Sequence, residues 1–151
     1  MFAIKLSDLT PEELNLIEQA KLAAKNYFNK RSNRRVGAAL LCEDGSIYQG
    51  VSIRRTNASN STCSERMAID KATFDKKYEY KTIAIVGFID DTKPDKVTAP
   101  CGLCRQIMAE AEFNGDNQHK FNIILASPDL TNIIKTTTSE LLPFPYHGKE
   151  K

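Results

Sequence analysis

The cysteine pattern restricts what this chain can fold into more than any other feature. Cys63 stands alone, and Cys101 and Cys104 form a Cys-x-x-Cys pair. Both clusters lie at predicted starts of helices, where unpaired backbone N–H groups and the helix dipole stabilise thiolates. Because two of the four cysteines form this pair and the chain is not a short secreted one, we expect thiolates rather than disulfides. Three thiolates can hold one zinc ion.

The number of ligands and a nearby carboxylate decide between a structural and a catalytic zinc site. Structural sites are closed by four protein ligands, whereas catalytic sites keep three and leave the fourth position to water. A closed site completed by His119 or His147 is the alternative, while Cys42 is expected to be an ordinary buried thiol on a hairpin. Glu65 favours catalysis, because its carboxylate can take a proton from zinc-activated water and deliver it to a substrate nitrogen.

The charge of such a site calls for a cation beside it. Zn²⁺ with three thiolates carries a formal charge of about −1 and is a poor Lewis acid for activating water. Arg66 lies three residues after Cys63, on the same face of the predicted helix. We expect Arg66 to donate a hydrogen bond to a ligand sulfur and to withdraw charge from it; a solvated side chain is the alternative.

Strands alternate with helices along the chain. The segment Thr10-Pro11-Glu12-Glu13 is typical of a capping box and begins a helix that reaches Tyr27 or Phe28. The other predicted elements are a hairpin over 36–53 with its turn at 43–46, a loop over 54–62, a helix over 63–77, a strand over 82–89, a loop over 90–100, a helix over 101–113, a strand over 121–127 and a short helix over 139–142. This alternation indicates a layered α/β domain.

Length and composition limit the class of protein. The 151 residues predict one domain over 1–151, because a second full domain does not fit. With 41% hydrophobic and 26% charged residues, the chain differs from disordered, collagen-like and coiled-coil sequences. A net charge of +2 is too small to indicate nucleic acid by itself. No window approaches the roughly 20 apolar residues that cross a bilayer, so we expect a cytoplasmic protein with no membrane partner.

Two motifs carry a resemblance to a known family. The segments Cys63-Ser64-Glu65-Arg66 and Pro100-Cys101-Gly102-Leu103-Cys104-Arg105-Gln106 are similar to the CAER and PCGxCRQ motifs of the small, homotetrameric cytidine deaminases. Zinc nucleobase deaminases in general share a histidine or cysteine, a glutamate and a PCxxC pair. The likeness extends to residues 36–41, to the spacing from Gly50 to Cys63 and to residues 140–143, so it covers nearly the whole chain.

This resemblance implies a fold, a reaction and a substrate class. The fold is a three-layer α/β/α sandwich with a five-stranded mixed sheet. The reaction is hydrolytic deamination of a small-molecule substrate, namely cytidine, deoxycytidine or a related aminopyrimidine. Water activated by one Zn²⁺ per subunit attacks C4 while Glu65 shuttles protons. The resemblance also implies that Ser64, Ala99 and Pro100 hold the base, and that Tyr146 reaches into a neighbouring site of a homotetramer.

The sequence departs from the family pattern where the substrate is held. Family members commonly have FPVGAA, with an aromatic side chain against the substrate, where this chain has Arg34-Arg35-Val36-Gly37. They also have Asn-x-Glu on the ribose hydroxyls, where this chain has Ser52 and Arg54. Guanidinium groups bind phosphate or carboxylate bidentately, so Arg34 and Arg54 favour an anionic substrate, such as a nucleotide monophosphate or another aminated heterocycle. Arginines that are solvated, or paired with acids of an adjacent subunit, are the alternative.

Two further hypotheses belong to other functional classes. A deaminase-like protein that keeps zinc for structure would use its basic loops only to bind a nucleotide or nucleic acid, and turnover of any aminopyrimidine would exclude it. A polynucleotide deaminase would need aromatic stacking platforms and a basic channel for single strands. The chain has no tryptophan and few aromatic residues in its basic loops, so we expect no nucleic-acid partner.

Overall fold

The computed structural model describes residues 2–27, 33–89, 93–114, 121–146 and 148. The strands are β1 (Phe2–Ile4), β2 (Arg35–Cys42), β3 (Ile47–Val51), β4 (Tyr80–Phe88), β5 (Asn122–Ala126) and β6 (Ile133–Thr137). The helices are α1 (Pro11–Lys25), α2 (Ser64–Phe74), α3 (Gly102–Asn114) and α4 (Thr138–Leu141), with short 3₁₀ turns at Leu6–Asp8 and Ala58–Asn60. None of these helices is long and apolar enough to cross a membrane.

The strands form one mixed sheet in the order β1-β6-β5-β4-β2-β3. Strand β2 is antiparallel to both β3 and β4, and β4 is parallel to β5. The hairpin of β2 and β3 closes at Gly45, whose φ of +85° is a conformation that glycine adopts readily. Strands β3, β4 and β5 therefore point the same way, and a helix follows each of the first two.

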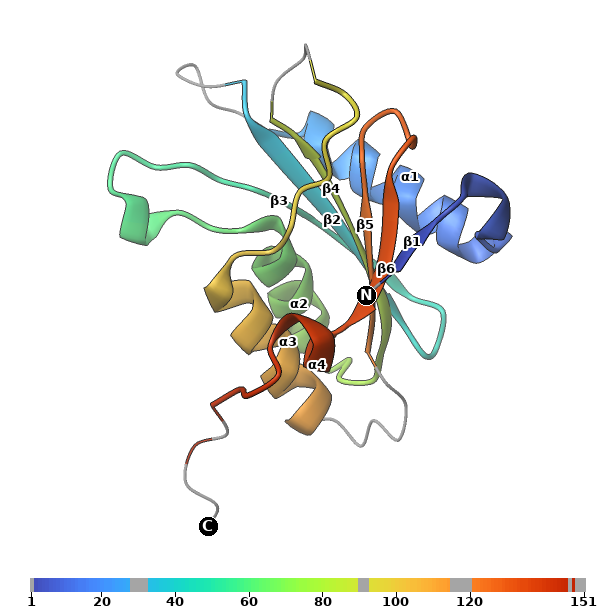
Figure 1. The fold of residues 1–151 in the computed structure, drawn as a ribbon. Coiled ribbons are helices and arrows are strands. Elements are labelled where there is room, and N and C mark those ends of the chain that lie inside the picture. Colours follow the sequence, from blue (N-terminus) through green and yellow to red (C-terminus); the bar gives the residue numbers. More distant parts are fainter. Residues whose placement is uncertain (1, 28–32, 90–92, 115–120, 147, 149–151) are drawn as a thin grey trace.

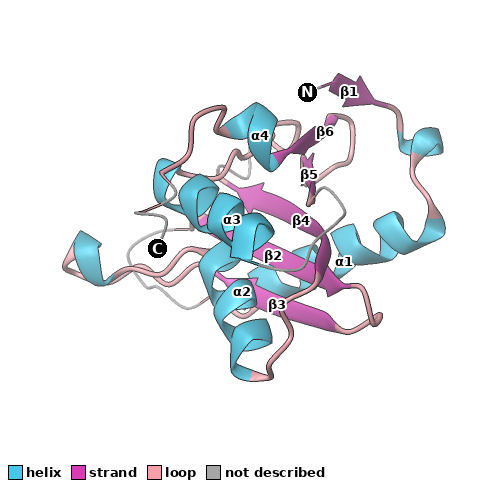
Figure 2. Cartoon of the chain, turned by 90° about the horizontal axis from the view of Figure 1, so that it is seen from below, coloured by secondary structure: helices cyan, strands magenta, loops and turns pink. Residues whose placement is uncertain are grey.

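Helices cover both faces of the sheet, which confirms the predicted three-layer α/β/α sandwich (Figures 1 and 2). Helix α1 buries Leu16, Ile17 and Ala20 against one face, where Ala39 and Val86 also lie. Helices α2 and α3 pack on the other face, over alternate residues of the same strands. The central strands are thus buried on both sides, as the continuous apolar runs of their sequences indicate.

The sheet has six strands rather than the five that the family resemblance implied. The additional pairing is that of β1 with β6 at the edge, where Ala3 lies opposite Ile134. Strand β1 has three residues, and two of them are exposed, so it carries no apolar pattern from which a strand could be predicted.

Helix boundaries agree with the predictions to within a few residues. Helix α1 begins with the predicted capping box at Thr10 and ends at Lys25, slightly before Tyr27; Phe28 lies outside the described residues. Helix α2 ends at Phe74 rather than at residue 77, because Lys76 has a φ of +59° and cannot continue a right-handed helix. The predicted helix at 139–142 is α4, one residue earlier.

The strand directions bring the starts of α2 and α3 together. Helix α2 follows β3, and helix α3 follows β4, so both helices begin beyond the carboxyl ends of parallel strands. In layered α/β folds this edge is where ligands bind. The topology thus places Cys63 and the Cys101/Cys104 pair on the same side of the molecule, although 38 residues separate Cys63 from Cys101.

Close packing at Gly50 sets the position of α2 over β3. A Cβ atom at Gly50 would collide with the Ser64 carbonyl and lie 2.7 Å from the Ala68 nitrogen. We expect Gly50→Ala to lower the free energy of unfolding by roughly 3 kcal/mol, because overpacking forces the helix outward. Chemical denaturation of the zinc-loaded protein measures this effect. Gly102→Ala is the control, since a Cβ there meets nothing within 4 Å, and equal losses in both variants would contradict the argument.

Candidate active site

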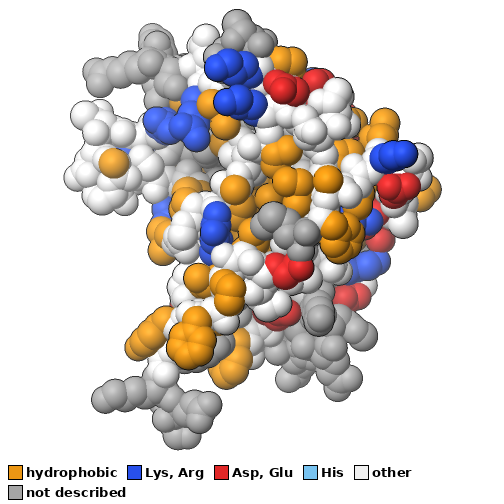
Figure 3. Space-filling model, in the orientation of Figure 1, with side chains coloured by type: hydrophobic (Ala, Val, Ile, Leu, Met, Phe, Trp, Pro, Cys, Tyr) orange, Lys and Arg blue, Asp and Glu red, His pale blue; other side chains and the backbone are white. Residues whose placement is uncertain are grey.

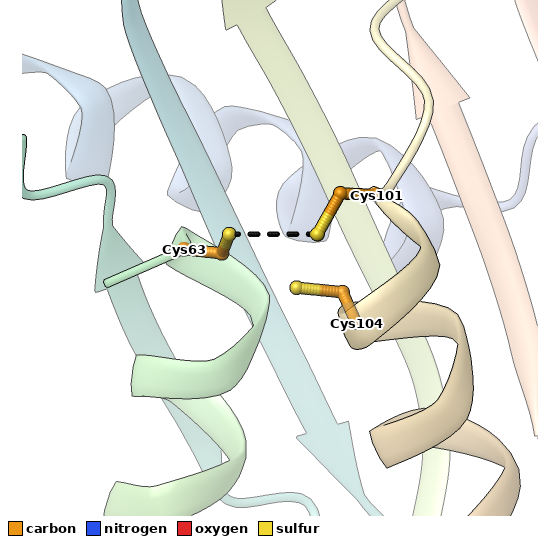
Figure 4. A group of neighbouring side chains, drawn as sticks. All are labelled: Cys63, Cys101 and Cys104. Atoms are coloured by element: carbon orange, nitrogen blue, oxygen red, sulfur yellow. Dashed lines mark hydrogen bonds between the residues drawn. The ribbon is translucent and has the colours of Figure 1, made fainter. Parts of the chain in front are cut away.

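The sulfur atoms of three cysteines meet where α2 and α3 begin (Figure 4). Cys63 is the residue that caps α2, Cys101 directly precedes α3, and Cys104 lies in the first turn of α3. The three Sγ atoms all lie within 4.8 Å of one another, and those of Cys63 and Cys101 are 3.7 Å apart. This convergence confirms that the three predicted ligands can share one metal ion.

The spacing of the sulfur atoms fits tetrahedral zinc. Zinc–sulfur bonds of about 2.3 Å at tetrahedral angles place two sulfur atoms about 3.8 Å apart, close to the separation of Cys63 and Cys101. Among the described residues, the group of possible ligand atoms has these three members. Cys42 is buried on β2 as an ordinary thiol, and His119 and His147 lie outside the described residues. Three ligands leave a fourth coordination position, the arrangement of a catalytic zinc site.

The cluster is electrostatically suited to a cation. A hydrogen bond with Cys104 lowers the pKa of the Cys63 thiol, and the same bond together with burial raises the pKa of Cys104. The first backbone N–H groups of each helix have no partner within the helix, so they favour negative charge on the sulfur atoms. Three neighbouring thiols in such surroundings can give up protons when they bind a metal ion.

Arg66 supports the cluster differently from the prediction. Its Nη2 donates to the Ser61 carbonyl at 2.6 Å, and this is the hydrogen bond that the structure gives it, rather than one to a sulfur. Ser61 lies close because Ile53 and Thr62 pair as an isolated β-bridge and bring the loop back to the start of α2. The charge of Arg66 still contributes to the lowered pKa of Cys63, although it is the smallest of the contributions.

Glu65 lies in the first turn of α2, beside the cluster of Cys63, Cys101 and Cys104. Its side chain is buried, with 4% of the residue exposed, and it lines the same pocket as Cys63 and Cys101. Ser64, which is fully buried, donates from Oγ to the Oε2 atom of Glu65 at 2.8 Å. The carboxylate is therefore held in one orientation, next to the position where a metal ion would activate water.

A pocket of about 400 Å³ opens beside these residues, within the size range of small-molecule sites. Its walls are formed by the start of β2, the loop that follows the end of β3 and leads to α2, and the segment before Cys101. Its lining residues are Arg34, Val36, Ser52, Ile53, Arg54, Arg55, Ala58, Ser61, Thr62, Cys63, Ser64, Glu65, Thr98, Ala99 and Cys101. A second hollow of about 380 Å³, over the outer side of α2, contains none of the cysteines and does not include Glu65.

Most of the residues expected to bind substrate line this pocket. Ser52, Arg34 and Arg54 do so, and so do Ser64 and Ala99. The sequence analysis did not identify Arg55 or Thr98. Arg55 follows Arg54 directly, and its side chain would face the other way if the strand continued. Because β3 ends at Val51, that alternation does not hold, and both arginines line the pocket.

The two remaining predicted substrate contacts lie elsewhere. The Pro100 carbonyl accepts a hydrogen bond from Arg105 Nε at 3.0 Å, and Pro100 is not among the lining residues. Tyr146 also lies outside the pocket, where the Gln106 side chain accepts from its backbone N–H at 3.0 Å and donates to its carbonyl at 2.6 Å. Tyr146 is 73% exposed and is not among the residues that line the pocket of its own subunit.

A three-layer α/β/α fold, three converging thiols and a buried carboxylate in one pocket define a zinc-dependent hydrolase. Residues 11–115 match the family described as the cytidine and deoxycytidylate deaminase zinc-binding region. A cytidine deaminase of Sporosarcina psychrophila is 41% identical over 128 residues, which are 85% of this chain and 86% of that protein. The cytidine deaminase of Halalkalibacterium halodurans is 39% identical over 135 residues, which are 89% and 94% of the two chains.

Solved structures agree with these sequence comparisons. The cytidine deaminase of Burkholderia pseudomallei superposes with a TM-score of 0.76 at 29% identity, over 91% of this chain and all of that one. The cytidine deaminase of Mycobacterium tuberculosis, at 22% identity and a TM-score of 0.68 over 88% of this chain and 95% of that one, shares the fold. The chain belongs to the cytidine and deoxycytidylate deaminase family and is a zinc-dependent aminohydrolase.

Proposed function

We propose that this protein catalyses the hydrolytic deamination of a cytosine nucleoside, releasing ammonia and the corresponding uracil nucleoside. The observation that carries the proposal is the position of Glu65, which is buried and lines the same pocket as two of the three converging cysteines. Relatives at 41% and 39% identity that bear the name cytidine deaminase support the choice of substrate.

The metal ion and the side chains have different roles in the reaction. When held by Cys63, Cys101 and Cys104, zinc supplies a Lewis acid that lowers the pKa of water to about 7. Glu65 accepts one proton of the attacking water and passes it to ring N3, and it then carries the remaining hydroxyl proton to the amino nitrogen, so that C4 becomes a carbonyl carbon and the amino group leaves as ammonia. The hydrogen bond from Ser64 Oγ keeps the carboxylate oriented for both transfers, so the same group serves first as base and then as acid.

The base is proposed to lie between the start of α2 and the segment before α3. Ser64 and Ala99 line the pocket from these two sides. The Pro100 carbonyl is engaged by Arg105, so Ala99 is the better placed of the two residues to contact the base. Arg105 also donates to the Leu141 carbonyl at 3.3 Å and thereby joins the segment before α3 to the end of α4.

Ammonia release by the zinc-loaded protein tests the proposal. We expect turnover of cytidine, deoxycytidine or their derivatives, with loss of absorbance as the cytosine ring becomes uracil. The control is zinc-loaded Glu65→Gln protein prepared identically, which reveals any contaminating deaminase. Absence of turnover on every aminopyrimidine tested would contradict the proposal and would favour the alternative, a zinc protein that only binds nucleotides.

We further propose that the protein is a homotetramer in which Tyr146 completes the pocket of a neighbouring subunit. The nearly full exposure of Phe144 and the large exposure of Tyr146, on a backbone that Gln106 holds against α3, support this proposal. Light scattering should give four times the mass of the chain, and Tyr146→Ala should raise KM for substrate. A monomeric mass with full activity would contradict the proposal.

A further inference from the structure

Three arginines, Arg34, Arg54 and Arg55, are among the residues that line the pocket with Glu65. Arg34 directly precedes β2, and Arg54 and Arg55 follow β3 in the loop that leads to α2. These two segments are neighbours because β2 and β3 pair in the sheet, with Gly37 opposite Val51. In this view the Lys and Arg side chains gather over the same end of the sheet, beside the loop between β3 and α2 (Figure 3).

Alternation of side chains at the start of β2 separates Arg34 from Arg35. Arg34 and Val36, two residues apart, line the pocket. Arg35 lies between them in the sequence, and its guanidinium instead lies 4.6 Å from the centre of the Phe88 ring. Phe88 packs with the core on the side of α1, so Arg35 belongs to the opposite face of the sheet. Arg35 can therefore serve as a control for the arginines that line the pocket.

The described lining of the pocket has no amide side chain, and no carboxylate besides Glu65, that could accept from the hydroxyls of a neutral sugar. Ser52 is bound twice to Val36 of β2: its N–H donates to the Val36 carbonyl at 2.9 Å, and its Oγ accepts from the Val36 N–H at 3.0 Å. Glu65 is the one carboxylate among the lining residues, and it belongs to the catalytic machinery. Ribose hydroxyls are commonly held by carboxylate or amide oxygens. Here the described lining offers positive charge in their place.

The loop that carries two of the arginines is held in place at its base. Ile53 and Thr62 exchange backbone hydrogen bonds at 2.8 and 2.9 Å, and the Arg55 N–H donates to Ser61 Oγ at 3.1 Å. Arg66, in the helix that carries the metal ligand, fixes the Ser61 carbonyl. A charged loop anchored to the catalytic helix can bind an anion with little ordering cost, because its backbone is already positioned.

We propose that the substrate is a phosphorylated cytosine nucleoside, whose phosphate is bound by Arg54 and Arg55, with Arg34 on the facing wall. This inference rests on the proposed deaminase function and specifies the substrate class of the same site. Guanidinium groups bind phosphate through paired, charge-assisted hydrogen bonds, and the three arginines of this pocket carry enough positive charge to neutralise the two negative charges of a monophosphate. The base then faces Glu65 and the cysteine cluster.

The test compares phosphorylated and neutral substrates on the zinc-loaded full chain. The values of kcat/KM are measured for CMP, dCMP and cytidine with the unchanged protein, with Arg54→Gln/Arg55→Gln and with the control Arg35→Gln. We expect the unchanged protein to prefer the monophosphates. The double variant should lose roughly 10- to 100-fold in kcat/KM for CMP, the usual range for a lost charge-assisted contact, and less than about threefold for cytidine. Arg35→Gln should leave the ratio of the two substrates unchanged.

A binding measurement separates this inference from the deaminase proposal. Calorimetry compares UMP with uridine, the corresponding products, so it does not depend on turnover. Loss of UMP affinity alone in the double variant upholds the phosphate site, even if no substrate is deaminated and the proposed function fails. A preference of the unchanged protein for cytidine over CMP, or equal effects of the double variant on UMP and uridine, overturns the phosphate site and leaves the deaminase proposal standing.

Discussion

Glu65→Gln is expected to lower kcat for deamination by roughly 10³- to 10⁴-fold while the protein keeps its zinc. General acid–base catalysis contributes typically about 10²- to 10⁴-fold, and the upper part of this range applies because Glu65 is proposed to move protons in two steps. The glutamine side chain has the same shape and can still accept the hydrogen bond from Ser64 Oγ, but it cannot take up a proton. Zinc content by mass spectrometry and kcat on the best substrate are the two measurements.

The matched control is Glu43→Gln, which removes a carboxylate from the exposed turn between β2 and β3. It should retain full kcat, because the turn lies outside the pocket lining. If Glu65→Gln kept more than about a tenth of the activity at full zinc content, Glu65 would not be the proton shuttle. If it lost zinc as well, its role would be to support the metal site rather than to move protons.

Cys104→Ser is expected to lose both zinc and stability. The Cys104 side chain is buried, with 1% of the residue exposed, and its sulfur faces those of Cys63 and Cys101. A serine hydroxyl does not ionise at neutral pH, so the site keeps two thiolate ligands. A bound ligand such as zinc, present at 1,000 times its Kd, raises the free energy of unfolding by about 4 kcal/mol. In a chain of this size each 1 kcal/mol shifts Tm by about 2–4 °C. We therefore expect Tm to fall by about 10 °C.

A second cysteine of equal burial provides the control for this prediction. Cys42 is also buried, with 2% of the residue exposed, and it lies on β2, outside the cluster of three cysteines. Cys42→Ser should lose some packing stability yet keep one zinc per chain. Removal of zinc from the unchanged protein with a chelator should reproduce most of the fall in Tm seen with Cys104→Ser. Full zinc content in Cys104→Ser would show that Cys104 is not a ligand.

Much of the fold could be predicted because its signals are local. Apolar periodicity and the capping box at Thr10 predicted α1, and the apolar runs predicted β2, β4 and β5. The local pattern did not predict β1 and β6: the edge strand β1 is mostly exposed, and β6, which lies between β1 and β5, has an interrupted apolar pattern. Edge strands depend on a long-range partner, here Phe2–Ile4 on Ile133–Lys135, which a local pattern does not contain.

Local spacing was enough to predict the chemistry of the site: two motifs hold three cysteines and Glu65 at the starts of helices, and these motifs predicted a metal site with a proton carrier. The folded arrangement of the chain set the surroundings of that site. It turned Arg66 toward the Ser61 carbonyl, kept Tyr146 out of its own pocket and brought Arg55 into it beside Arg54. These outcomes depend on how loops fold back over helices and where strand alternation ends. Contacts between distant segments set both, whereas local spacing determines neither.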